Sequence, residues 1–239
     1  MIFDFFGTIA CHENGATSEY PAVFARHGRR LDPLIESAHF ARYNGALHLE
    51  HSTDRATYEA WVRFRHAELA VACDVPAADV ERLVDDLRVS DTLPVVAYPD
   101  AAPTLGTLRD RGFRIGVCSN WGWEIDAFLI QADLFDLVDV AITSARAGAR
   151  KPHQRIFAAM TDALGVRPAE ALFVGDSLRP DVEGPAEVGM SAVHLRRPED
   201  SAGAPPGPLP PGAERITSLT ALLDWPALER AAGGLAPSS

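Results

Sequence analysis

The 239-residue sequence has one lysine, Lys151, although lysine and arginine together number 22. Chemistry that requires an amine side chain therefore depends on this residue. The basic residues are outnumbered by 33 acidic ones, which gives a formal net charge of −11. This balance argues against a nucleic-acid partner, because general nucleic-acid binders need a basic face.

Long apolar runs and paired cysteines are also missing. No run approaches the roughly 20 apolar residues of a membrane-spanning helix, so we expect no membrane partner. The first four residues include no basic segment before an apolar stretch, unlike a secretory signal. The three cysteines show no CxxC spacing, which argues against a disulfide framework or a zinc knuckle. We therefore expect a cytoplasmic protein.

The hydrophobic pattern predicts an α/β protein. Strands are expected at Ile2–Phe5, Phe113–Cys118, Val138–Ile142, Ala171–Val174 and Ser191–Leu195. Helices are expected between them, near residues 100–111, 123–131, 154–164 and 182–188. Strands that alternate with helices favour right-handed crossovers and a parallel sheet covered on both faces, as in a Rossmann-like doubly wound fold.

A long helical stretch interrupts this pattern after the first strand. Apolar residues recur at spacings of three and four from about residue 16 to residue 93, for example at Tyr58, Trp61, Val62 and Leu69. We therefore predict an α/β core formed by residues 1–14 and 95–239, with a helical cap domain at 15–94. Residues 202–212 are rich in Pro and Gly and are expected to form a loop, and residues 233–239 to be frayed.

Polar residues follow four of the predicted strands, where ligands bind in open parallel sheets. They are Asp4 with Gly7 and Thr8, Ser119 with Asn120, Lys151, and Asp176 with Asp181. Carboxylates that are brought close together repel one another and need a cation. Oxygen donors without Cys or His suit Mg²⁺ better than zinc. A carboxylate beside a phosphoryl group can act as a nucleophile, with Lys151 to stabilise the anion.

These four segments resemble the haloacid dehalogenase-like hydrolase superfamily, in the branch with a helical cap after the first strand. The similarity lies in their order and spacing: Phe3-Asp4-Phe5-Phe6-Gly7-Thr8, Val117-Cys118-Ser119-Asn120, Gly148-Ala149-Arg150-Lys151-Pro152, and Phe173-Val174-Gly175-Asp176-Ser177 with Asp181 and Gly189.

The resemblance implies a role for each site residue. Asp4 would be the nucleophile, and Thr8, Ser119 and Lys151 would serve the catalytic step. Phosphate would be bound by Gly7, Thr8, Ser119, Asn120 and Lys151. The resemblance also implies Mg²⁺, held by Asp4, Asp176, Asp181 and the backbone carbonyl of Phe6. The expected reaction is hydrolysis of a small phosphate monoester.

Phe6 departs from this pattern, because phosphatases of the superfamily usually carry a second Asp there. That Asp protonates the leaving alcohol and activates water, which Phe cannot do. An aromatic residue at this position resembles the 2-haloacid dehalogenases instead, although their fourth motif differs from the one in this chain. A third alternative is a weakly active protein that binds phosphorylated ligands. Imine chemistry of the phosphonate hydrolases is excluded, because the predicted cap contains no lysine.

Several further residues are weaker candidates. His12 and Glu13 could supply an acid–base group from the hinge, and Trp121 and Trp123 could line the pocket. In the predicted cap, Arg42, Tyr43, Arg63 and Arg65 could contact an anionic substrate, although helix arginines are more often ion-paired or solvated. The expected partner is a small, phosphorylated molecule, and the expected assembly is a monomer or homodimer.

Overall fold

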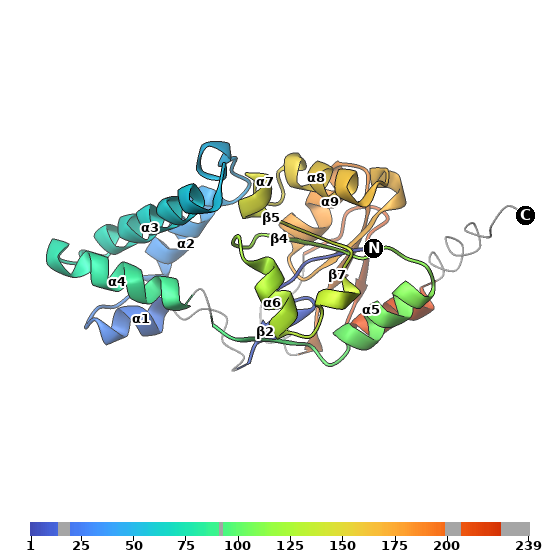
Figure 1. Cartoon of the computed structure of the whole chain (residues 1–239), viewed down its shortest axis with the longest axis horizontal. Helices are drawn as coiled ribbons and strands as arrows, with labels where there is room; N and C mark the ends of the chain where they lie inside the picture. The colour runs from blue at the N-terminus through green and yellow to red at the C-terminus, as the bar shows by residue number, and fades with distance from the viewer. Residues whose placement is uncertain (14–19, 91–92, 199–206, 226–239) are drawn as a thin grey trace, which may run out of the picture.

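A computed structural model describes residues 1–13, 20–90, 93–198 and 207–225. Within these residues a six-stranded, fully parallel sheet forms the centre of the α/β core (Figure 1). The strands follow the order β5-β4-β1-β6-β7-β8. Their bounds are β1 Ile2–Phe3, β4 Gly116–Ser119, β5 Val140–Thr143, β6 Leu172–Gly175, β7 Ser191–Leu195 and β8 Glu214–Ile216. The predicted α/β fold class is confirmed.

Helices cover both faces of this sheet. One face carries α5 (Ala101–Asp110) and α6 (Ile125–Gln131), and the other carries α8 (Gln154–Leu164) and α9 (Gly184–Glu187) (Figure 1). Short turns of 3-10 or π helix lie at Phe135–Leu137, Pro168–Glu170, Leu178–Glu183 and Leu219–Asp224, and α7 spans Ser144–Ala147.

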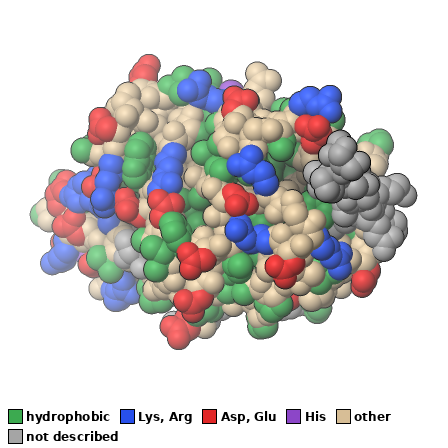
Figure 2. Space-filling model, turned by 45° about the vertical axis from the view of Figure 1, so that its right-hand side comes forward, with side chains coloured by type: hydrophobic (Ala, Val, Ile, Leu, Met, Phe, Trp, Pro, Cys, Tyr) green, Lys and Arg blue, Asp and Glu red, His purple; other side chains and the backbone are tan. Residues whose placement is uncertain are grey.

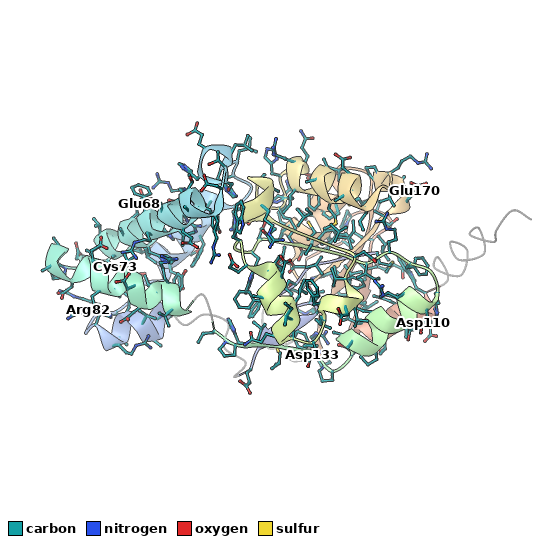
Figure 3. The ribbon with its side chains drawn as sticks, viewed as in Figure 1. Glu68, Cys73, Arg82, Asp110, Asp133 and Glu170 are labelled. Carbon is teal, nitrogen blue, oxygen red and sulfur yellow. The ribbon has the colours of Figure 1, made fainter. Side chains whose placement is uncertain are left out.

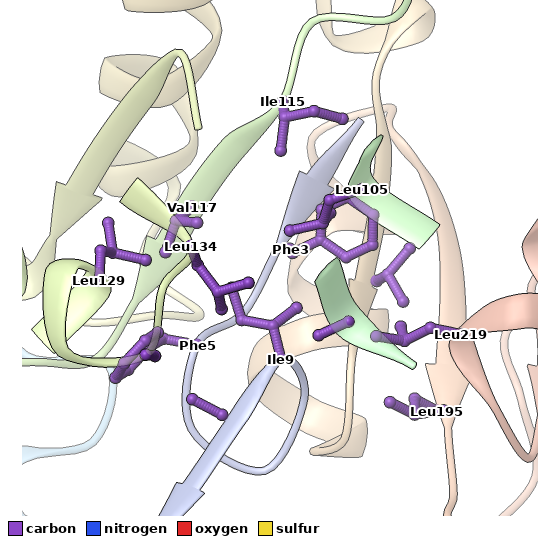
Figure 4. Close-up of a cluster of buried hydrophobic side chains, with 14 of the residues drawn as sticks. Phe3, Phe5, Ile9, Leu105, Ile115, Val117, Leu129, Leu134, Leu195 and Leu219 are labelled. Atoms are coloured by element: carbon purple, nitrogen blue, oxygen red, sulfur yellow. The ribbon is translucent and has the colours of Figure 1, made fainter. Parts of the chain in front are cut away.

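Successive strand residues supply the two hydrophobic cores, because alternate side chains of a strand point to opposite faces. Phe3 packs with Leu105 of α5 in one core, whereas its neighbour Ile2 packs with Phe157 of α8 in the other. Figure 4 shows the first core, in which Phe3, Phe5 and Ile9 meet residues of α5, α6 and the C-terminal strands. The short β1 is therefore anchored from both sides.

Helices α1–α4 form a separate group beside the sheet, which we call the helical module (residues 20–90; Figure 1). The helices are α1 Tyr20–Arg26, α2 Pro33–Tyr43, α3 Arg55–Ala72 and α4 Ala77–Ser90, with a 3-10 turn at Leu49–His51. They share a core that includes Phe24, Leu69 and Leu83. Two short antiparallel strands, β2 (Ala10–His12) and β3 (Val95–Ala97), flank the module in the sequence.

Main-chain hydrogen bonds join the helical module to the core. The amide of His48 donates to the carbonyl of Gly148 at 2.8 Å, and the amide of Arg150 donates to the carbonyl of Ala46 at 3.2 Å. Beside this bridge, Tyr58 and Trp61 of α3 pack against Ala145 of the core. The loop that carries Lys151 is thus held from the module side.

The structure corrects several predicted elements. Strand β1 ends at Phe3, two residues before the expected end, and the helix predicted near residue 182 is preceded by a π turn that begins at Leu178. Strands β2, β3 and β8 were not predicted, because each has only three residues and shows no clear alternation. Residues 207–212 contain no helix or strand, whereas the rest of the predicted loop and residues 233–239 lie outside the described residues.

Charged side chains of both signs are interspersed on the face shown in Figure 2. None of the helices in the described ranges has the length and apolar character that crossing a bilayer requires.

Candidate active site

The carboxyl ends of the central strands bring most of the predicted site residues to one edge of the sheet. Asp4 follows β1, Ser119 ends β4 and Asp176 follows β6. The amide of Asp4 donates to the carbonyl of Val174 at 2.9 Å, which continues the β1–β6 pairing by one residue. Ser119 is buried and pairs with Thr143 of β5. Strand pairing therefore fixes the backbone beneath the site.

The amine of Lys151 lies between two carboxylates. Its Nζ donates to Asp4 Oδ1 at 2.7 Å and to Asp181 Oδ1 at 2.6 Å, and all three side chains are buried. Burial by itself would lower the pKa of Lys151, but the carboxylates of Asp181 and Asp4 outweigh it and raise that pKa. Lys151 is thus held as an ammonium beside the predicted nucleophile.

Asp176 completes a cluster of three carboxylates. One oxygen from each of Asp4, Asp176 and Asp181 lies within 4.8 Å of the others. Burial, together with the carboxylates of Asp4 and Asp181, raises the pKa of Asp176 to about 7. Burial likewise raises the pKa of Asp181 to about 6, and Lys151 opposes this shift. The cluster therefore carries unfavourable negative charge that one lysine does not fully balance.

The donor set of this cluster suits a hard divalent cation. It offers carboxylate oxygens without Cys or His, which is the chemistry preferred by Mg²⁺. Asp176 receives hydrogen bonds from the hydroxyls of Thr8 and Ser177, both at 3.4 Å. Among the described residues, no Lys or Arg forms an ion pair with it within 4.0 Å. The residues present therefore fit the ion implied by the sequence.

Two glycines allow the loops to approach these carboxylates. Gly7 has φ +82°, and a Cβ there would lie 2.8 Å from the Asp176 carboxyl carbon. A Cβ at Gly175 would lie 2.5 Å from the Asp181 carboxyl carbon. Side chains at either position would displace a carboxylate of the cluster.

The side chain of Asn120 holds the Lys151 loop from the core side. Its Nδ2 donates to the carbonyl of Lys151 at 3.0 Å, and its Oδ1 accepts from the amide of Lys151 at 2.7 Å. The Lys151–Pro152 peptide bond is cis. The observed contacts of Asn120 thus position the lysine.

Phe6 presents an aromatic ring two residues after Asp4. Its ring stacks on Trp121, with centroids 5.8 Å apart, and lies 4.6 Å from the ring of His12. Trp121 also contacts Phe5 and Phe128, whereas Trp123 faces Tyr58 of the helical module. Glu13, the other hinge candidate, is exposed.

Two supporting residues near the site carry no signal in the sequence. The His194 Nε2 donates to the carbonyl of Asp176 at 2.8 Å, and its Nδ1 accepts from Arg215 at 3.1 Å. The Arg197 guanidinium forms an ion pair with Asp100 and donates to the carbonyl of Thr8 at 2.8 Å. Both residues hold loops of the site by donating to main-chain carbonyls. Such contacts have no sequence motif by which they could be predicted.

The three arginines of the helical module that were predicted as substrate contacts differ in their partners. Arg42 forms an ion pair with Glu68, and Arg63 forms ion pairs with Glu81 and Asp85. Arg65 instead lies over the ring of Tyr43.

The parallel α/β core and the buried acidic cluster at the carboxyl ends of its strands define the class of protein, and a family model identifies the family. The haloacid dehalogenase-like hydrolase model matches residues 1–189, so the chain belongs to this family.

Individual relatives are named for each of the two reactions considered above. The chain is 36% identical over 104 residues to a glyceraldehyde 3-phosphate phosphatase of Methanopyrus kandleri, a match that covers 42% of this chain and 43% of that protein. It is 32% identical over 136 residues to an (S)-2-haloacid dehalogenase of Burkholderia cepacia, which covers 56% of each. These matches span about half the length of those relatives.

The fold comparison extends over nearly the whole chain. A crystal structure of a phosphatase of this family from Thermococcus onnurineus superposes with a TM-score of 0.61 at 27% identity. The superposition covers 93% of this chain and 95% of that one.

Proposed function

We propose that the protein is a Mg²⁺-dependent phosphatase that hydrolyses a small phosphate monoester through an aspartate nucleophile, Asp4. One observation carries the proposal: the Lys151 ammonium lies between Asp4 and Asp181, with Asp176 within 4.8 Å of both carboxylates. Three buried acids around one amine would repel one another without a further cation. The phosphatase name of the Methanopyrus relative supports the same reaction.

In the proposed reaction, an oxygen of Asp4 attacks phosphorus, the P–O ester bond breaks, and the alkoxide leaves and takes its proton from water. The Lys151 ammonium, which donates to Asp4, stabilises charge that develops on the phosphoryl oxygens. Thr8 and Ser119 hydrogen-bond the nucleophile or the phosphoryl group, and Gly7 and Asn120 contribute to the phosphate-binding loops. Water then hydrolyses the acyl phosphate and regenerates Asp4.

The proposed ion site consists of Asp4, Asp176, Asp181 and the Phe6 carbonyl. A bound Mg²⁺ would neutralise the cluster and stabilise phosphoryl charge. His194 supports this site, because its hydrogen bond fixes the main chain at Asp176.

We further propose that residues 15–94 act as a cap over a core formed by residues 1–14 and 95–239. The helical module supports this role, because it is joined to the Lys151 loop by the bridge at Ala46–His48. A cap in this position would exclude water from the site and select the substrate.

A second candidate is hydrolysis of a carbon–halogen bond in a 2-halo acid. The specific observation in its favour is Phe6, since a halide leaves without a proton, and the Burkholderia relative is named for that reaction. The acidic cluster favours the phosphatase.

A substrate panel tests the proposal. Phosphate esters and 2-halo acids are incubated with protein in Mg²⁺ or in chelator, and phosphate and halide release are measured. We expect phosphate release that chelator abolishes. Halide release that persists in chelator would establish the dehalogenase instead. Ligand-dependent thermal stabilisation without product, even at high protein concentration, would indicate a binding protein.

A further inference from the structure

Two arginines, one from the helical module and one from the core, share an unusual environment. Arg65 comes from α3, and Arg150 comes from the loop that carries Lys151. The Nε atoms of both are buried and have no hydrogen-bond partner in the described part of the chain. Burial, followed by repulsion from Arg65, lowers the pKa of Arg150 to about 10. Contacts link the two segments as well: Arg65 lies over the ring of Trp61, and His48 stacks on that ring. The amide of His48 bonds to the carbonyl of Gly148, two residues before Arg150.

Their lack of a counter-ion distinguishes these residues from their neighbours. Arg42 and Arg63 of the module, and Arg146 of the core, each pair with at least one carboxylate. In the described ranges, neither Arg65 nor Arg150 has a carboxylate within 4.0 Å. Buried charges are ordinarily paired, so this pair is incomplete without an anion.

The Arg65 guanidinium lies against aromatic rings, and the Glu68 carboxylate beside one of them is already engaged by Arg42 and by the Tyr43 hydroxyl. Arg65 lies 4.1 Å from the ring centroid of Tyr43 and 4.7 Å from that of Trp61. His48 stacks on Trp61, and its buried Nε2 has no partner among the described residues. Burial, with Arg150 and Arg65 nearby, lowers the pKa of His48 to about 4, so this ring is neutral near pH 7.

The main chain of Arg150 also adjoins a catalytic candidate. Arg150 directly precedes Lys151, whose Nζ contacts Asp4, and the Arg150 amide bonds to Ala46 of the module. We propose that Arg65 and Arg150 form a second anion site, which binds a second anionic group of the substrate while its phosphoryl group lies at Asp4. This inference rests on the proposed phosphatase function.

The inferred substrate class is a small phosphate monoester with a further carboxylate or phosphate. Guanidinium groups bind both anions through paired N–H donors, and a partly buried setting strengthens such bonds. Simple alkyl phosphates would leave the two charges uncompensated. The site would thus select substrates by charge at their far end.

A matched three-carbon series tests this inference. Propyl phosphate, 3-phosphooxypropionate and propane-1,3-diol bisphosphate are compared by steady-state phosphate release in Mg²⁺. We expect at least tenfold higher kcat/KM for one of the doubly anionic esters, mainly through a lower KM. A higher kcat/KM for 3-phosphooxypropionate would indicate a carboxylate as the second group, and a higher value for the bisphosphate would indicate a phosphate. Equal values for all three compounds would overturn the inference.

Variants locate the effect. Arg150→Gln and Arg65→Gln should each reduce, at least fivefold, the preference, that is, the ratio of kcat/KM for the doubly anionic ester to kcat/KM for propyl phosphate. The control Arg82→Gln removes an exposed arginine from α4, well away from the sheet, and should retain it (Figure 3). Because Arg65 packs on two rings, thermal unfolding is measured for each variant, and Arg150→Lys provides a milder change. A preference that survives in folded Arg150 and Arg65 variants would contradict the assignment.

Binding separates this inference from the proposed function. Butylphosphonate and 4-phosphonobutyrate contain a C–P bond that ester hydrolysis does not break, so calorimetry measures their affinity without turnover. About tenfold tighter binding of 4-phosphonobutyrate or of 1,4-butanediphosphonate supports the second site even if no ester is hydrolysed. Equal affinities for all three phosphonates would reject it even in an active phosphatase.

Discussion

The ring of Phe6 stacks on the ring of Trp121, with their planes inclined by 22°. Phe6 occupies the position two residues after Asp4, where phosphatases of the superfamily usually carry a second Asp. The stacked ring leaves no proton donor or acceptor at that position. This relationship determines which phosphate esters the protein should hydrolyse well.

The first prediction concerns the leaving group. Loss of general acid–base catalysis ordinarily costs about 10²–10⁴ in rate. We expect slow hydrolysis of alkyl phosphates and a much smaller deficit with p-nitrophenyl phosphate, which leaves without protonation. Phe6→Asp should narrow the ratio between the two rates. Equal wild-type rates on both esters would mean that another group has replaced the missing acid. In that case His12→Gln would test whether the His12 imidazole, whose ring lies 4.6 Å from that of Phe6, is the replacement.

The second prediction concerns the glycine that lies against Asp176. Gly7→Ala introduces a strained φ and a contact at 2.8 Å with the Asp176 carboxyl carbon. We expect a loss of about 1–2 kcal/mol in stability and markedly weaker Mg²⁺ binding. Gly112→Ala is the matched control, because Gly112 has φ +85° and a Cβ there would meet no atom within 4 Å. It should lose similar stability and keep its Mg²⁺ affinity, as measured by thermal unfolding and calorimetry. Equal loss of affinity in both variants would argue against a role for Asp176.

The third prediction concerns pH. The pKa values of Asp176 and Asp181 are raised to about 7 and about 6, so the folded protein binds protons that the unfolded chain releases. These groups therefore stabilise the metal-free fold below about pH 4, and this contribution is lost as pH rises toward 7. Mg²⁺ competes with the protons, so its stabilising effect should grow between about pH 5.5 and about pH 8. Thermal unfolding in Mg²⁺ and in chelator measures both trends, and a Mg²⁺ effect independent of pH would contradict this assignment.

The fourth prediction concerns the shape of the amine. Lys151 Nζ contacts two carboxylates at 2.7 and 2.6 Å within a buried site. Lys151→Arg keeps the charge but introduces a larger, planar group. We expect at least a tenfold loss in kcat, with the variant still folded by circular dichroism. Wild-type kcat in this variant would show that charge alone suffices.

Much of the fold could be predicted from the sequence, because the periodicity there is strong. Helix α8 and strand β7 have their predicted bounds, Gln154–Leu164 and Ser191–Leu195. Short strands were not predicted, because a three-residue strand such as Glu214–Ile216 is too short to show the alternation of apolar and polar residues. Sheet pairing with β7, a long-range contact, makes that segment a strand.

In the candidate site, too, some residues were predicted from the sequence and others were not. The carboxylates, Thr8 and Lys151 were predicted from motifs, and the structure brings them together. The supporting contacts of His194 and Arg197 were not predicted, because both donate to main-chain carbonyls of distant segments. The difference between Arg65 and the paired Arg63 was likewise hidden, since the sequence does not show which helix arginines meet a carboxylate.

The most direct test of Asp4 as the nucleophile is to trap the phosphorylated enzyme. Protein is mixed with a ³²P-labelled ester in Mg²⁺, quenched in acid within one turnover and digested with pepsin at acid pH, where an acyl phosphate survives. We expect base-labile label in a peptide that contains Asp4, and none in Asp4→Asn. Label in another peptide, or turnover that survives Asp4→Asn, would contradict Asp4 as the nucleophile.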